Sequence, residues 1–88
     1  MKISLAMIVK NEARCLARCL RSVQTVVDEM IVVDTGSTDD TVKIANQLGA
    51  KIFHFDWCND FSAARNFALE QATGDWILVL DADETVSA

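Results

Sequence analysis

Four short runs of apolar, largely β-branched residues alternate with three segments of helical periodicity, and this alternation constrains the fold more than any other feature. The runs are predicted strands, and they cover Ile3 to Val9, Met30 to Val33, Ala50 to Phe55 and Trp76 to Leu80. Strands separated by single helices are typical of a parallel sheet covered by helices. We therefore expect one undivided α/β domain over residues 1–88, with a Rossmann-like β-α-β-α-β-α-β sheet.

Each predicted helix has a start signal and an inner face. Asn11 is a candidate N-cap for the first helix. Ser37 and Asp40 have the spacing of a capping box for the second helix. The third helix would begin at Asp60 or Ser62. Apolar residues at helical spacing would face the sheet, and they are Leu16, Leu20 and Val23, then Val42, Ala45 and Leu48, and then Phe61, Ala64, Ala68 and Ala72.

The outer strands differ in composition. The run from Trp76 to Leu80 is apolar at every position, as expected for a strand that is covered on both faces. Lys51 and His54 interrupt the third run, which favours a position at the edge of the sheet.

Charge and cysteine content exclude several classes of function. A net charge of −5 offers no basic surface to nucleic acid, and an acidic protein that handles a phosphorylated small molecule would need a metal cation. Cys15, Cys19 and Cys58 lack the further ligands of a metal site, so we expect unlinked thiols in a reducing cytoplasm. The apolar stretch in the segment MKISLAMIVKNE is too short for a signal peptide or a membrane span.

Acidic residues follow three of the four predicted strands, where ligands bind in open parallel sheets. Asp34 taken alone is typical of a turn or a helix cap. Asp81 and Asp83 stand at alternate positions of an extended segment, so both carboxylates would point to one side and could bind Mg²⁺ or Mn²⁺. The simpler alternative is a solvated polar loop.

Three further polar residues have competing interpretations. Arg65 could lie on the surface with its aliphatic stem on an apolar face, or it could reach an anionic or carbonyl group of a ligand. His54 is interpreted as an edge-strand residue. Asp39 and Asp40, expected in the first turn of a helix, are explained by the helix dipole.

Four segments together resemble the amino-terminal half of the family 2 glycosyltransferases, in the order and spacing of that family. They are AMIVKNE (residues 6–12), IVVDTGSTDDT (31–41), FSAARNFAL (61–69) and GDWILVLDADE (74–84). The resemblance implies the GT-A fold, a nucleotide-diphospho-sugar donor and a divalent metal, Mn²⁺ or Mg²⁺. Thr35 departs from the many members that carry a second Asp at its position.

The resemblance also assigns roles to site residues. Asp34 would contact the nucleobase and Glu12 would approach the nucleoside. Asp83 would bind the metal that bridges the diphosphate. The whole donor site implied in this way consists of Val9, Glu12, Asp34, Arg65, Asp81 and Asp83.

Asp81 and Asp83 form a D-x-D motif. Family domains continue well beyond this motif, so the resemblance also implies that this chain is a truncated, donor-binding fragment. The acceptor site and the general base would be missing, and the fragment is expected to bind nucleotide weakly and to transfer no sugar. In the family's strand order, 3-2-1-4, the run WILVL would form an uncovered edge, which predicts a homodimer or higher oligomer.

Other functions compete with this interpretation. A non-catalytic nucleotide-sugar-binding module would have the same residues. A nucleotidyltransferase-like domain would carry a Gly-rich basic loop after the first strand, where KNEARC stands. A receiver or flavodoxin-like domain would carry clustered acids at the first strand end and a Lys after a late strand, and the chain has neither in that order.

Overall fold

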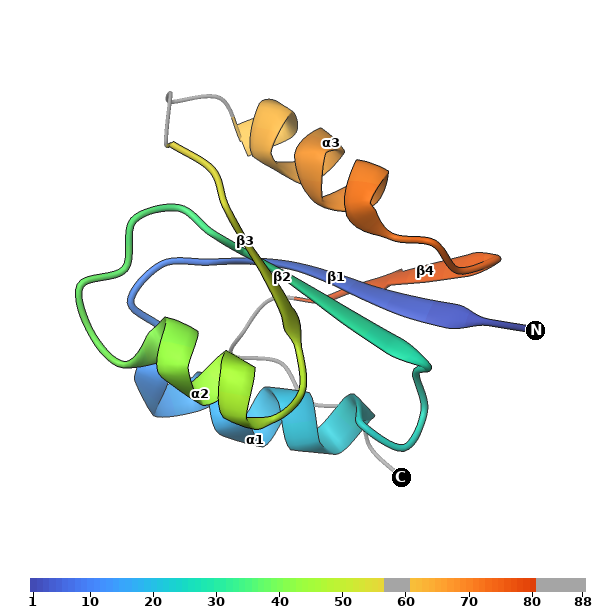
Figure 1. Ribbon diagram of the computed structural model, residues 1–88, viewed down its shortest axis with the longest axis horizontal. Coiled ribbons are helices and arrows are strands. Elements are labelled where there is room, and N and C mark those ends of the chain that lie inside the picture. Colours follow the sequence, from blue (N-terminus) through green and yellow to red (C-terminus); the bar gives the residue numbers. More distant parts are fainter. Residues whose placement is uncertain (57–60, 81–88) are drawn as a thin grey trace.

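The computed structural model describes residues 1–56 and 61–80, apart from the side chain of Phe61. It confirms the predicted alternation of strands and helices (Figure 1). None of its helices is both long and apolar enough to cross a bilayer within this described part of the chain. The elements are β1 (Ile3–Val9), α1 (Ala13–Val23), β2 (Glu29–Asp34), α2 (Thr41–Gln47), β3 (Lys51–His54), α3 (Phe61–Gln71) and β4 (Trp76–Val79).

The four strands form one parallel sheet with the order β3-β2-β1-β4. In its register Val9 at the end of β1 pairs with Asp34 at the end of β2, and Asp34 pairs with His54 at the end of β3. The carboxyl ends of these three strands are therefore level with one another. The parallel pairing and the edge position of β3 confirm the sequence-based expectations.

Helices cover the two faces of the sheet unequally, with α1 and α2 on one face and α3 on the other (Figure 1). Side chains of β1 alternate between these faces, so that Leu5, Met7 and Val9 pack with α1 while Ala6 packs with α3. The buried Ala68 of α3 lies against Ala6. Small residues on both elements allow the helix to approach the sheet closely.

Strand β4 is less covered than its composition predicted. Helix α3 packs on β1 and β2, and β4 lies at the end of the strand order. Trp76, Ile77 and Val79 are consequently 62%, 42% and 48% exposed. The prediction of a strand covered on both faces is wrong, whereas the uncovered apolar edge expected from the 3-2-1-4 order is present.

The first two helices do not begin with the caps that the sequence predicted. Helix α1 has Glu12 at its N-cap position and α2 has Asp40, and neither side chain makes a capping hydrogen bond. The assignment of Asn11 as an N-cap and of Ser37 and Asp40 as a capping box is therefore wrong. Asp39 and Asp40 were expected in the first turn of a helix, but both precede α2, which begins at Thr41.

The amino ends of the strands are joined by the buried carboxylate of Glu29, at the start of β2. It accepts hydrogen bonds from the Ser4 hydroxyl at 2.6 Å, the Lys51 ammonium at 2.8 Å and the Thr73 amide at 2.9 Å. These donors, with Lys51 first, lower the pKa of Glu29 from 4.5 to about 2, although burial acts in the opposite direction. Glu29 thus connects β1, β3 and the segment before β4.

Candidate functional site

Two loops meet at the carboxyl edge of the sheet, and we call residues 10–12 the first loop and residues 35–40 the second loop. They follow β1 and β2, which are neighbouring strands. The amide and the hydroxyl of Thr35 both donate to the carbonyl oxygen of Val9, at 3.0 and 3.1 Å. The Val9 side chain is buried in the core, so any contact between Val9 and a ligand would be through its backbone.

Asp34 closes the turn after β2. Its carboxylate accepts hydrogen bonds from the amides of Gly36 at 3.2 Å and Ser37 at 3.1 Å. Gly36 has a φ of +118°, a conformation that favours glycine. Asp34 itself is only 4% exposed. Asp34 therefore has the turn role expected of an isolated Asp.

His54 lies beside this carboxylate, with Nδ1 at 3.6 Å from Oδ2 of Asp34. The two residues are partners in the β2–β3 register, and His54 is on the edge strand as expected. The sequence did not predict this pairing, because the register between strands separated by a helix has no local signal in the sequence.

Asn11 bonds the first loop to the second. Its backbone lies in the left-handed region, with a φ of +53°. Its amide donates to the Ser37 hydroxyl at 2.9 Å, and its side-chain oxygen accepts from the Thr38 amide at 2.8 Å. The polar residues predicted to cap their own helices therefore bond across the two loops.

Asp39 of the second loop and Thr41 of α2 also accept hydrogen bonds from the amides at the start of α1. The amide of Glu12 donates to the Thr41 hydroxyl at 2.9 Å, and the amide of Ala13 donates to the Asp39 carboxylate at 3.4 Å. The Thr41 hydroxyl in turn donates to Asp39, and this bond is the main reason that the pKa of Asp39 is lowered. Asp39 thus serves the amino end of α1, a role that the sequence did not predict.

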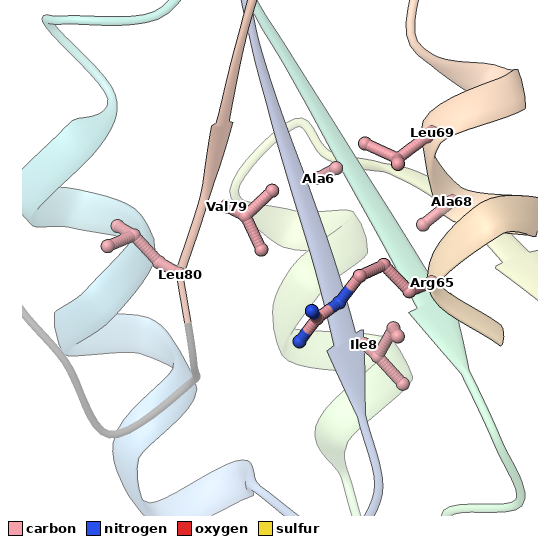
Figure 2. Close-up of a pocket in the computed structure, with 7 residues that line it drawn as sticks. All are labelled: Ala6, Ile8, Arg65, Ala68, Leu69, Val79 and Leu80. Atoms are coloured by element: carbon pink, nitrogen blue, oxygen red, sulfur yellow. The ribbon is translucent and has the colours of Figure 1, made fainter. Parts of the chain in front are cut away.

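A pocket opens on the α3 side of the sheet, between α3, β1 and β4 (Figure 2). Arg65 extends from α3 across β1 and lies near Ile8 in this view. The lining is apolar apart from the Arg65 side chain, and the space it encloses, about 10 Å³, is about that of one water molecule. The lining residues are Ala6, Ile8, Arg65, Ala68, Leu69, Val79 and Leu80.

The structure brings some of the predicted site residues together. Val9, Glu12 and Asp34 share the carboxyl edge of β1 and β2, while Arg65 lines the neighbouring pocket on the α3 side. Asp81 and Asp83 lie outside the described residues. Within residues 1–56 and 61–80, no three His, Cys, Asp or Glu side chains are grouped closely enough to hold a metal ion.

A parallel sheet with polar loops gathered at its carboxyl edge is the arrangement of open, Rossmann-like α/β proteins. The model of the Glycosyl transferase family 2 matches residues 4–88, and the chain belongs to that family. A TPR repeat-containing protein of Synechococcus elongatus is 64% identical over 83 residues, which are 94% of this chain and 21% of that protein.

Solved structures show the same architecture. TarS of S. aureus, residues 1–349 in complex with UDP, has a TM-score of 0.79 and 31% identity over 94% of this chain and 28% of that one. Glucosyl-3-phosphoglycerate synthase of Mycobacterium tuberculosis, in complex with Mn²⁺, UDP and glucosyl-3-phosphoglycerate, has a TM-score of 0.74 and 28% identity over 92% of this chain and 33% of that one. The fold is therefore the GT-A fold of family 2 glycosyltransferases, as expected, and the chain spans a third or less of these proteins.

Proposed function

We propose that this chain is the donor-binding part of a glycosyltransferase that moves a sugar from a nucleotide-diphospho-sugar to an acceptor. The observation that carries the proposal is the joined pair of loops at the carboxyl edge, with Asp34 fixed by the second loop and Arg65 on the α3 side of the sheet. The UDP named in both solved relatives supports a nucleotide as the ligand.

Each described site residue has a binding role in this proposal. The Asp34 carboxylate, although only 4% exposed, would accept a hydrogen bond from the nucleobase, and Glu12 would approach the nucleoside from the first loop. The Arg65 guanidinium would meet a carbonyl or anionic group of the donor. Asp81, outside the described residues, would lie near the ribose. Binding and orientation of the donor are therefore the tasks that we assign to this chain.

We further propose a divalent metal, Mn²⁺ or Mg²⁺, with Asp83 as a ligand. The Mn²⁺ in the mycobacterial enzyme supports this assignment, and so does the charge of −5, which would repel an uncompensated diphosphate. A bound metal would act as a Lewis acid that offsets charge on the departing nucleoside diphosphate. Because Asp83 lies outside the described residues, its support comes from sequence and relatives.

These 88 residues alone are proposed to bind the donor without transferring sugar. Removal of a proton from an acceptor hydroxyl needs a positioned base, and we assign that base to the part of longer relatives that this chain does not span.

Self-association through β4 completes the proposal. β4 pairs with β1 on one side, and its exposed residues Trp76, Ile77 and Val79 are apolar. An apolar edge strand of this kind tends to pair with a second copy. We also propose a cytoplasmic location, which the three cysteines, an odd number without the further ligands of a metal site, favour.

Calorimetric titration of UDP and GDP, with and without Mn²⁺, tests the donor site. We expect metal-dependent binding that Arg65→Gln weakens by about tenfold, the value of one charge-assisted hydrogen bond. Arg21→Gln, on α1 at the other face of the sheet, is the matched control and should leave affinity unchanged. Absence of binding by the unmodified chain under every condition would overturn the proposal.

A further inference from the structure

We propose that Asn11 is a positioning residue that holds the two loops in the arrangement the nucleotide requires, an inference that rests on the donor-binding function proposed above. Asn11 itself need not touch the ligand. Its contribution is to fix the residues on either side of the site relative to one another.

The conformation of Asn11 suits this task. A φ of +53° is unfavourable for most side chains, and Asn tolerates it better than other residues that have a Cβ atom. In this conformation the amide of Asn11 points to Ser37 and its side-chain oxygen points to Thr38, whose amide and hydroxyl donate at 2.8 and 3.3 Å. One side chain and one amide thus hold two consecutive residues of the second loop.

These bonds lead directly to the proposed nucleoside contacts. Ser37 accepts a hydrogen bond from Asn11 through its hydroxyl and donates its own amide to the Asp34 carboxylate. Glu12 is the next residue in the chain after Asn11, and its amide is held by Thr41. If the Asn11 bonds were lost, the second loop would be held less firmly against Glu12, and binding would have to supply that order.

A purely structural role for Asn11 is the competing explanation, and burial separates the two. Asn11 is exposed, so its replacement leaves no cavity in the core. The bonds from Thr35 to Val9, from Glu12 to Thr41 and from Ala13 to Asp39 remain to hold the loops near each other. Loss of the Asn11 side chain should therefore change the order of the loops more than the stability of the domain.

The test uses Asn11→Gly, which keeps the left-handed backbone and removes the side-chain acceptor. We expect UDP affinity in calorimetry to fall by about tenfold, the equivalent of one hydrogen bond and its ordering, while Tm changes by less than about 2 °C. Amide hydrogen exchange at Thr38 should accelerate about tenfold. Thr38→Ala is the matched control, because it keeps the backbone donor to Asn11 and should preserve affinity within about threefold.

Asn11→Asp supplies a rescue, since it keeps both an oxygen acceptor and tolerance for the left-handed conformation. We expect it to restore slow exchange at Thr38. A fall in Tm with unchanged UDP affinity in Asn11→Gly would overturn the positioning role, and so would unchanged exchange at Thr38. If the unmodified chain bound no nucleotide, the proposed function would fail and this inference with it, whereas the exchange data would still report whether Asn11 joins the loops.

Discussion

Ser4 and Glu29 face each other across the amino ends of β1 and β2, and the Ser4 hydroxyl donates a 2.6 Å hydrogen bond to the Glu29 carboxylate. The same carboxylate accepts from Lys51 and from Thr73. This end of the sheet is opposite to the proposed site, so substitutions here should affect stability without contributing to donor binding.

Stability should decrease in acid because of Glu29. Its pKa in the folded chain, about 2, is below the ordinary value of 4.5, so its contribution is complete above pH 4.5 and is lost as the pH falls towards 2. Glu29→Gln should lower the free energy of unfolding by about 1 to 3 kcal/mol at pH 6.5. At pH 3 the free energies of the variant and the unmodified chain should differ by less. Urea unfolding at both pH values measures this. The exposed Glu70→Gln on α3 is the control, and parallel pH profiles for Glu29→Gln and the unmodified chain would contradict the prediction.

Gly74→Ala should destabilise the domain. A Cβ atom at this position would lie 2.5 Å from the Ser4 hydroxyl oxygen and 2.9 Å from the carbonyl oxygen of Lys2. The backbone cannot move away freely, because the Gly74 amide donates to Ser4 at 2.8 Å. We expect a loss of about 1 to 3 kcal/mol, measured by urea unfolding. In the background of Ser4→Ala, which itself loses the bonds to Glu29 and Gly74, the cost of Gly74→Ala should be smaller but should persist, since the backbone oxygen of Lys2 remains; no cost in that background would show that the hydroxyl alone is responsible.

Ile77→Lys should reduce self-association. Ile77 is 42% exposed on β4, and a charge on an edge strand opposes pairing with another strand. Light scattering at micromolar concentration should give an oligomeric mass for the unmodified chain and a monomeric mass for the variant. Val26→Lys is the matched control, because Val26 is an apolar residue of similar exposure, 47%, that lies after α1 outside the sheet. A monomeric mass for the unmodified chain would refute self-association.

Removal of divalent metal should abolish most of the binding of UDP. The diphosphate would meet a protein of charge −5 without compensation. Titration of UDP in EDTA should give no measurable heat, and Asp83→Ala should behave in the same way when Mn²⁺ is present. Equal affinity with and without metal would contradict the assignment of Asp83.

Much of the fold could be predicted because its signals are local. The runs that form β1 and β2, and the stripe of Leu16, Leu20 and Val23 on α1, follow from the spacing of apolar residues. The caps were mispredicted because their partners lie elsewhere: the residues that bond to Asn11 are 26 and 27 positions away in the sequence. Capping motifs assume a partner three residues away, and no local pattern in either loop indicates that the two loops bond to each other.

Burial of β4 and the pairing at the site were harder to predict. An apolar run does not show whether a helix will cover it, and α3 lies over β1 and β2. The contact between Asp34 and His54 depends on strand register. At the site itself, the sequence correctly indicated which strand ends carry polar residues, but the shared bonding of the two loops appeared only in three dimensions.

The hydrogen bonds between the second loop and the start of α1 also restrict how the chain can evolve. An insertion in the second loop would displace Ser37 and Asp39, and the amides of Asn11 and of Ala13, the first residue of α1, would lose their partners. Loop lengths that vary independently in most α/β proteins are tied together here. Changes in one crossover should persist in descendants only where the other crossover has changed to match.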